Sequence, residues 1–458
     1  MKFACPHCQQ HLEADESLIG TTLNCPVCGK SIVVGPHQPA EARVDAPVAD
    51  APKAAPQFRV VAPPPKTAAE QGKDAGNRID LEDKVRKSVA SLHNRFNDFT
   101  GLEKLEGFSL SALFSEIFGK HKSEDIEEFF TVGTPRATPP IEAVDTSWPR
   151  PWLFFRALAF SIVMYLVLSG GYDYFHNQNL IPGMMLMGTL AVPFSTLLFF
   201  YEVNVRQNIS LYQILRLFFL GGILSLLISL VFFELAGDSP KGMWAQAAPG
   251  PIEETGKLLA LLLVARSMRY HYKINGLLMG AAIGTGFAVF ESMGYALRWL
   301  INGEIQGFVQ VALKQTRTVS SVNIMKDVIF LRGVLSPLGH IVWTAIAGAA
   351  LWRVKGKKPF RFGMFANGKF WHLFLIPVVL HSLWDMQIPF LDKLPYYGKY
   401  LLLGFVAWFV VLALVQEGLK ELRAEKMEAL ASHATDPESA TSGVMASNAQ
   451  NTDGPANG

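Results

Sequence analysis

The sequence is poor in charge. Only 17% of its 458 residues are Asp, Glu, Lys or Arg. The net charge of +2 is small and the basic residues are dispersed, which argues against a nucleic-acid partner. An HExxH sequence is absent, which excludes a simple zincin-type site. The opening MKFACPHCQQ lacks the apolar core of a signal peptide, so we expect the N-terminus to stay in the cytoplasm.

Hydrophobic residues make up half of the chain and are concentrated after residue 151. They form eight stretches, each near the ~20 residues that a helix needs to cross a bilayer. The fourth stretch is the weakest, because its uninterrupted apolar run is short. The sequence therefore predicts an all-α fold, a polytopic membrane helical bundle of about eight transmembrane helices. We place the spans at about 152–172, 181–201, 211–235, 245–265, 275–297, 333–353, 371–391 and 397–416.

The polar parts divide by composition. Residues 37–80 and 131–151 are rich in Pro and are predicted to be linkers, because such chains cannot pack a core. Residues 81–130 have apolar positions at helical spacing and predict a small helical module. The alternative is an amphipathic segment on the membrane or on the membrane domain. Residues 152–416 form the predicted membrane domain, and residues 417–458 a cytoplasmic, mostly disordered tail.

The only cysteines form two CxxC pairs near the N-terminus, Cys5 with Cys8 and Cys25 with Cys28. This spacing places four thiolates around one tetrahedral zinc ion, whereas two disulfides in an exported domain are the weaker alternative. Residues 1–36 therefore resemble the small zinc ribbons that begin many bacterial proteins. Because four thiolates close the coordination sphere, we expect the zinc to be structural. A cytoplasmic protein partner of this ribbon is a further expectation.

Lys and Arg in the short loops orient the predicted spans. Basic residues gather at 266–273, at 353–369 and at 420–426, which places both termini in the cytoplasm of a multi-pass protein in the cell inner (plasma) membrane. The loop at 298–332 is predicted to be outside although it carries five basic residues. Long loops count less than short ones when basic residues are used to orient a membrane protein, so we keep the predicted orientation with both termini inside.

Ionisable residues interrupt four of the apolar spans, where single charges are costly and usually functional. Each has a structural explanation by itself, such as a carboxylate in a first helical turn or a histidine bonded to a backbone carbonyl. Under the predicted topology, however, all of them fall in the outer halves of their helices. We therefore expect one cavity that opens to the extracytoplasmic side. The residues are Glu253, Glu254, Glu291, His340, His381 and Asp385, with Lys257 following the two glutamates.

Four stretches that carry these residues resemble, in order, the motifs of the PrsW family of bacterial intramembrane (glutamic-type) proteases. PIEETGK at 251–257 resembles its EExxK motif, and GFAVFES at 286–292 resembles its FxxxE motif. RGVLSPLGHIVWTAIAG at 332–348 resembles its third motif, and HSLWD at 381–385 its HxxxD motif. The family is similar to the CAAX prenyl endopeptidases, which use a glutamate and histidines in a membrane cavity.

The resemblance implies a membrane endopeptidase. Glu253 or Glu254 would be the general base that activates water. His340 and His381 would donate to the oxyanion or bind a metal. Lys257 would balance the charge of the carboxylates.

Two further residues complete this expectation. Glu291 would hold the water or a metal, and Asp385 would orient the imidazole of His381. A glutamate mechanism and a metal mechanism use the same residues, so the presence of a catalytic metal stays open. The implied partners are the lipid bilayer and a membrane-protein substrate, for example a regulator such as an anti-sigma factor. The alternatives from other classes are a proton-coupled transporter or channel and a non-catalytic membrane scaffold.

Overall fold

The computed structural model divides the chain into two compact units, Met1–Arg78 and Ile79–Gly458. Short strands are described in the first unit, and most of the second unit is described. The described positions are 2–4, 11–13, 22–24, 31–33, 95, 98–103, 105–237, 242–265, 269–312, 320–395 and 397–435.

The N-terminal unit contains two antiparallel hairpins. Strand β1 (Lys2–Ala4) pairs with β2 (His11–Glu13), and β3 (Thr22–Asn24) pairs with β4 (Ser31–Val33). In the sequence, each hairpin encloses one CxxC pair. The four cysteines and the linker at 37–80 lie outside the described residues, so the zinc ribbon stays a prediction.

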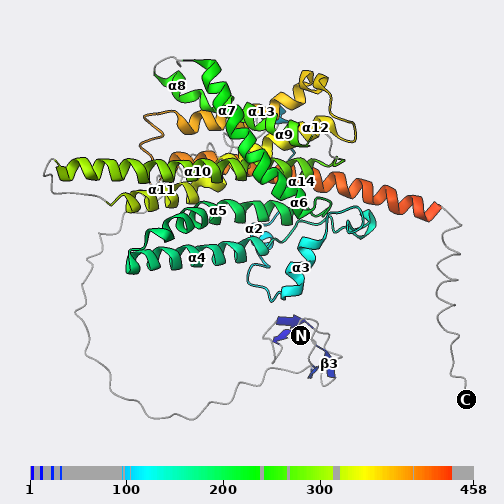
Figure 1. The fold of residues 1–458 in the computed structure, drawn as a ribbon. Coiled ribbons are helices and arrows are strands. Elements are labelled where there is room, and N and C mark those ends of the chain that lie inside the picture. The colour runs from blue at the N-terminus through cyan, green and yellow to red at the C-terminus, as the bar shows by residue number, and fades with distance from the viewer. Residues whose placement is uncertain are drawn as a thin grey trace, which may run out of the picture. The chain divides into compact units, whose positions relative to one another are not determined.

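The second unit is a bundle of α-helices, most of which run along one common direction (Figure 1). Residues before the bundle form α2 (Leu110–Leu113), α3 (Ser123–Thr131) and the 3-10 turn η2 (Ile141–Ala143). The bundle consists of α4 (Leu153–Phe175), η3 (Gln178–Leu180), α5 (Ile181–Val203), α6 (Leu211–Arg216), η4 (Leu217–Gly221), α7 (Gly222–Ala236), α8 (Met243–Ala247), α9 (Pro249–Ala265), α10 (Lys273–Ala312), α11 (Ser321–Leu335), η5 (Ser336–Leu338), α12 (His340–Lys355), η6 (Phe362–Ala366), α13 (Gly368–Asp385) and α14 (Gly398–Thr435).

Within the described residues, six helical stretches are long and apolar enough to cross a membrane. They are Leu153–Phe175, Gln178–Val203, Leu211–Ala236, Lys273–Asn302, Ser321–Lys355 and Gly398–His433. The sequence predicted about eight spans, two more than the six found among the described residues. Helices do form at the other two places, but α9 has only 17 residues with three charges in its first half, and the apolar run of α13 is interrupted by Lys369, His372, His381 and Asp385.

Three predicted boundaries were wrong. Residues 298–332, expected as a loop, continue α10 as far as Ala312 and begin α11 at Ser321, because no proline interrupts the helix before Pro337. The predicted span at 333–353 begins earlier, in the stretch Ser321–Lys355, where the 3-10 turn η5 with Pro337 separates α11 from α12. The tail after residue 416 stays helical to Thr435, since it is rich in Glu, Lys, Leu and Ala.

Helix α10 is the centre of the bundle. In the 18-residue apolar window of its membrane span 83% of the residues are buried, against 6% in the corresponding window of α4 at the periphery. Glycines at every fourth position, Gly276, Gly280 and Gly284, let α12 approach its backbone closely. A methyl group on Gly284 would lie 2.5 Å from the backbone oxygen of His340. This close approach fixes the first turn of α12 against the middle of α10.

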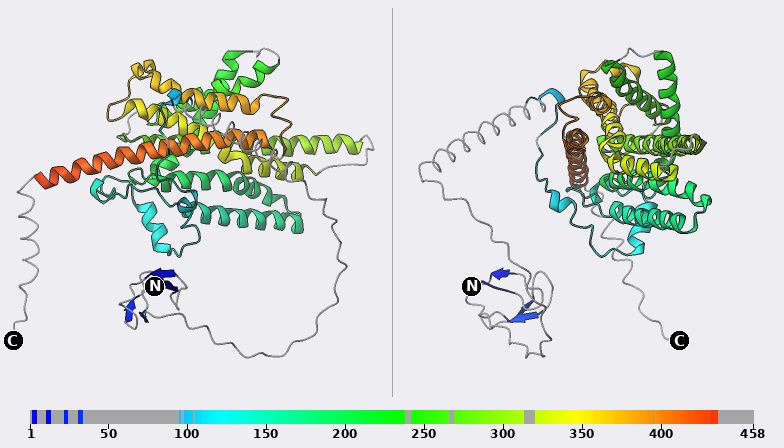
Figure 2. Two further views of the ribbon diagram at one scale, coloured as in Figure 1. Left: turned by 180° about the vertical axis from the view of Figure 1, so that it is seen from behind. Right: turned by 90° about the vertical axis from the view of Figure 1, so that its left-hand side faces the viewer.

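The segment before α4 packs along α14 in the helical unit (Figure 2). Arg353 donates to the backbone oxygens of Thr100 and Gly101 at 2.9 Å and 2.7 Å. The backbone N–H of Glu106 donates to Gln416 at 2.6 Å. Thr100, Gly101 and Glu106 therefore contact the bundle directly.

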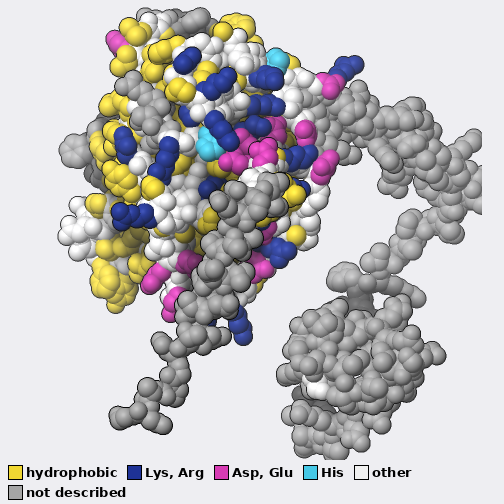
Figure 3. Space-filling model, turned by 90° about the vertical axis from the view of Figure 1, so that its right-hand side faces the viewer, with side chains coloured by type: hydrophobic (Ala, Val, Ile, Leu, Met, Phe, Trp, Pro, Cys, Tyr) yellow, Lys and Arg dark blue, Asp and Glu magenta, His cyan; other side chains and the backbone are white. Residues whose placement is uncertain are grey.

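Charged side chains gather at the end of the bundle from which α14 projects, and hydrophobic side chains border them (Figure 3). Ion pairs at this end join α14 to α10 and to the segment after α12. They are Lys273 with Glu417 at 3.4 Å and Lys357 with Glu425 at 3.4 Å. The predicted basic loops thus meet at one end of the molecule.

Candidate active site

Four helices bring the predicted site residues together. Helix α9 supplies two glutamates and a lysine from its first three turns, and α10 supplies a glutamate from its middle. Helix α12 begins with a histidine, and α13 ends with a histidine and an aspartate. Gly250 allows α9 to lie close to α13, because a methyl group there would be 2.6 Å from the backbone oxygen of Val378.

The innermost part of the site is a buried ion pair. The Lys257 ammonium donates to Glu254 Oε1 at 2.9 Å, and both side chains are fully buried. His381 Nδ1 lies 2.9 Å from the same oxygen. Glu254 Oε2 finds no hydrogen-bond donor among the described residues. Glu254 therefore connects α9 to α13 and sits too deep to meet solvent.

Lys257 also contacts the other parts of the site. Its ammonium donates to Glu253 Oε2 at 3.2 Å and to His340 Nδ1 at 2.9 Å. It lies 3.9 Å from the ring centre of Phe287, a cation–π contact. The phenylalanine of the FxxxE sequence thus supports the lysine of the EExxK sequence. Its acceptors on α9 and α12 and its contact with Phe287 on α10 thus place the lysine between three helices.

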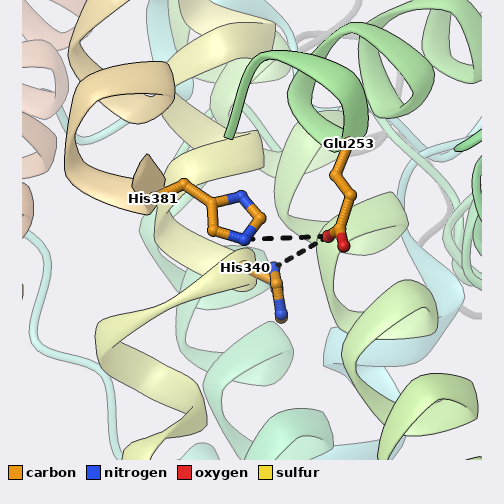
Figure 4. Close-up of side chains that lie close together, drawn as sticks. All are labelled: Glu253, His340 and His381. Atoms are coloured by element: carbon orange, nitrogen blue, oxygen red, sulfur yellow. Dashed lines mark ion pairs between the residues drawn. The ribbon is translucent and has the colours of Figure 1, made fainter. Parts of the chain in front are cut away.

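Glu253, His340 and His381 form a more open group (Figure 4). Glu253 Oε2 lies 4.0 Å from His340 Nδ1 and 3.8 Å from His381 Nε2. The side chain of Glu253 is 11% exposed, whereas that of Glu254 is 0% exposed. Of the two glutamates, only Glu253 can be reached from outside. We define Glu253, His340 and His381 as the donor group.

Each histidine is fixed by a carboxylate on the side away from the donor group. His340 Nε2 lies 3.1 Å from Glu291 Oε2, and His381 Nδ1 is held by Glu254. A histidine that donates one N–H to a carboxylate turns its other nitrogen toward a metal or a substrate. The geometry thus directs His340 Nδ1 and His381 Nε2 toward Glu253.

Asp385 lies at the open edge of the site. Its carboxylate is 3.4 Å from His381 Nε2, one helical turn along α13, and its side chain is 34% exposed. The expectation that Asp385 meets His381 agrees with this placement. Glu254, however, makes the shorter contact and fixes the ring from the buried side.

Arg332 joins the cluster and was not among the predicted site residues. Its guanidinium donates to Glu291 and, at 3.0 Å, to Ser292, and it lies 4.3 Å from the ring centre of Tyr295. An arginine within the apolar run VIFLRGVLSP is a signal that could have identified it. The sequence pattern instead suggested an exposed loop, where basic residues are common.

The cluster carries more negative than positive charge. Four carboxylates face two permanent cations, Lys257 and Arg332. With both histidines neutral, the four carboxylates outnumber the cations by two, and such an uncompensated negative charge is costly in an apolar surrounding. A divalent cation in the donor group would balance it, as would protons on the two histidines.

The donor group suits a metal in its chemistry and nearly in its spacing. One carboxylate and two imidazoles are a known ligand set for catalytic zinc, with bonds of about 2.0–2.2 Å. Such bonds place ligand atoms roughly 3.4 Å apart in a tetrahedron, slightly closer than the 3.8 Å and 4.0 Å found here. A metal would also bind Glu253 and His340 Nδ1, which now accept from Lys257. The lysine would then keep its hydrogen bond to Glu254.

Comparison with known proteins agrees with this arrangement. No curated protein and no solved structure matches the chain. The sequence model of the PrsW family of intramembrane metalloproteases, however, matches residues 210–415. The matched range begins at α6, ends in α14 and contains every residue of the cluster. Residues 210–415 thus form an intramembrane protease domain of the PrsW family, within a multi-pass membrane protein.

Proposed function

We propose that the protein hydrolyses a peptide bond of a membrane-protein substrate near the extracytoplasmic face, with the donor group as its catalytic centre. The observation that carries this proposal is the convergence of Glu253, His340 and His381 in the protease domain, each within reach of the others. A single-span regulator such as an anti-sigma factor is the substrate class that the resemblance favours.

A metal ion would be held by the donor group, where it would activate water and polarise the peptide carbonyl. The ion pairs of Glu253 with described residues all use Oε2, toward Lys257 and both histidines. Its other oxygen, Oε1, is left to take up the proton of the attacking water. We therefore assign to Glu253 the general-base role.

The remaining residues position these groups. Glu254 fixes His381 through Nδ1, and Glu291 fixes His340 through Nε2. Lys257 neutralises the buried Glu254 and keeps Glu253 directed toward the histidines. Asp385, at the open edge, contacts His381 where the leaving amine would collect a proton.

The orientation follows from the charged end of the bundle. The donor group lies at the first turns of α9 and α12, whereas Arg353 and Lys355 lie at the last turn of α12. If that basic end faces the cytoplasm, the donor group lies toward the extracytoplasmic side. Labelling of cysteines introduced as Lys357→Cys and Gln387→Cys tests this, and accessibility of position 357 from outside the cell would reverse the assignment.

The catalytic proposal is tested by reconstitution of wild-type protein, Glu253→Gln and Glu254→Gln in proteoliposomes with single-span reporter substrates. We expect Glu253→Gln to bind reporters but not to cleave them. Removal of metal with a chelator should stop cleavage by the wild type, and added zinc should restore it. Cleavage by Glu253→Gln at the wild-type rate would refute the assignment.

A further inference from the structure

A pocket of about 220 Å³ adjoins the donor group on the side of His340. It lies among α10, α11, α12, α13 and α14, and none of the site residues predicted from the sequence except His340 lines it. Pockets for whole small ligands usually measure about 300–1,000 Å³. This pocket is therefore of a size for one side chain rather than for a separate ligand.

Aromatic rings form the walls of this pocket. Trp384 lies 4.4 Å from the ring centre of Tyr400 and 5.3 Å from that of Trp343. Trp343 in turn stacks on His381 at 4.5 Å. Tyr397 is 57% exposed at the rim. Large rings of this kind provide much apolar contact area and keep a defined shape.

A positive charge in the pocket wall further restricts which side chains the pocket can bind. Arg332 lines the pocket, and its guanidinium is already paired with Glu291 and bonded to Ser292. A lysine or arginine side chain entering the pocket would meet this cation at short range without a free carboxylate. The pocket thus disfavours basic side chains. It does not favour acidic side chains either, because the Arg332 guanidinium is already paired.

We propose that this aromatic pocket binds the side chain of the substrate residue next to the cleaved bond, and that it selects a large apolar side chain, such as Phe, Leu, Met or Trp. The inference rests on the proposed function, because the pocket is assigned to the substrate only if His340, which lines it, belongs to the catalytic centre. A peptide whose carbonyl lies at the donor group would place a neighbouring side chain beside His340. Burial of that side chain among the rings would supply the binding energy.

The experiment uses a library of single-span reporter proteins with randomised residues near the outer membrane surface. The full-length protein is reconstituted with this library, and the cleaved bonds are identified by mass spectrometry. We expect bonds flanked by large apolar residues to be cut at least roughly tenfold faster than bonds flanked by Lys or Ala, the discrimination usual for an apolar pocket.

Two variants change the pocket in opposite directions. Leu335→Trp fills it, so cleavage next to large residues should fall by roughly tenfold while cleavage next to small residues persists. Trp384→Ala widens it, so the preference should shift toward the largest rings. Trp371→Ala is the matched control, because Trp371 lies at the other end of α13, is 43% exposed and bonds to Phe365 instead of the pocket. It should leave the preference unchanged.

The outcomes separate the two proposals. If the wild type cleaves nothing in the library, the proposed function fails and the pocket assignment fails with it. If the wild type cleaves without preference at any flanking position, the protease stands and the pocket assignment is refuted. A preference that both pocket variants leave unchanged would refute it as well.

Discussion

Replacement of Lys257 by methionine should destabilise the helical unit strongly. Lys257 and Glu254 are both fully buried, and the ammonium is 2.9 Å from the carboxylate. Methionine keeps most of the apolar stem but removes the charge, so Glu254 is left with His381 as its only bonding partner among the described residues. Breaking a buried pair in this way costs about 3–5 kcal/mol.

A double-mutant cycle isolates the pair from other effects of the substitution. Glu254→Gln removes the stranded charge, so the double variant with Lys257→Met should regain much of the stability lost by Lys257→Met alone. We expect a coupling energy of at least about 2 kcal/mol. Activity should not return, because Lys257 also directs Glu253 and His340.

The assay is reversible unfolding by SDS in mixed micelles, in the presence and absence of a chelator. Lys326 and Asp173 provide the control pair, since they are joined at 2.7 Å but the aspartate is 59% exposed. Their coupling energy should stay within about 0–1 kcal/mol. The reasoning is refuted if Lys257→Met costs less than about 1 kcal/mol with metal removed, or if the double variant recovers nothing.

Three further predictions concern the packing, the cluster and the N-terminal unit. Gly284→Leu should lower the free energy of unfolding by about 1–3 kcal/mol and abolish cleavage, because the larger side chain displaces α12. Gly294→Leu on the same helix, where nothing lies within 4 Å, should change neither the unfolding free energy nor the cleavage rate. Arg332→Gln should weaken zinc binding by roughly 10–100-fold, measured by competition with a fluorescent chelator, and Lys326→Gln should leave it unchanged. Residues 1–36 should bind one zinc ion and lose their circular-dichroism signal when it is chelated, and a fragment that stays folded without metal would contradict the ribbon.

Much of the site was predictable from helix geometry alone. His381 and Asp385 are four residues apart on α13, and Lys257 follows the two glutamates by three and four positions on α9. Residues at these spacings lie on one helical face, so their contacts are local and require no knowledge of the fold. The spans could be predicted for a similar reason, because a helix in lipid must satisfy its backbone internally and present apolar side chains outward.

The contacts between helices needed the tertiary structure. His381 and Glu254 are 127 positions apart, and Lys257 and His340 are 83 positions apart. Sequence patterns placed all of them in one cavity but did not say which nitrogen meets which carboxylate. Arg332 was missed because an expected loop is in fact helix α11, which carries it against Glu291.

The sequence by itself determined the apolar helices, the composition of the charged cluster and its order along the chain. Only the tertiary structure decided that Glu254 is buried and Glu253 reachable, although the two are neighbours of identical chemistry. The reason is physical: adjacent residues on a helix point about 100° apart, so the packing of α9 against α7 and α13 sets which of them faces the interior. Burial of a side chain is a property of its neighbours in space, and composition does not contain it.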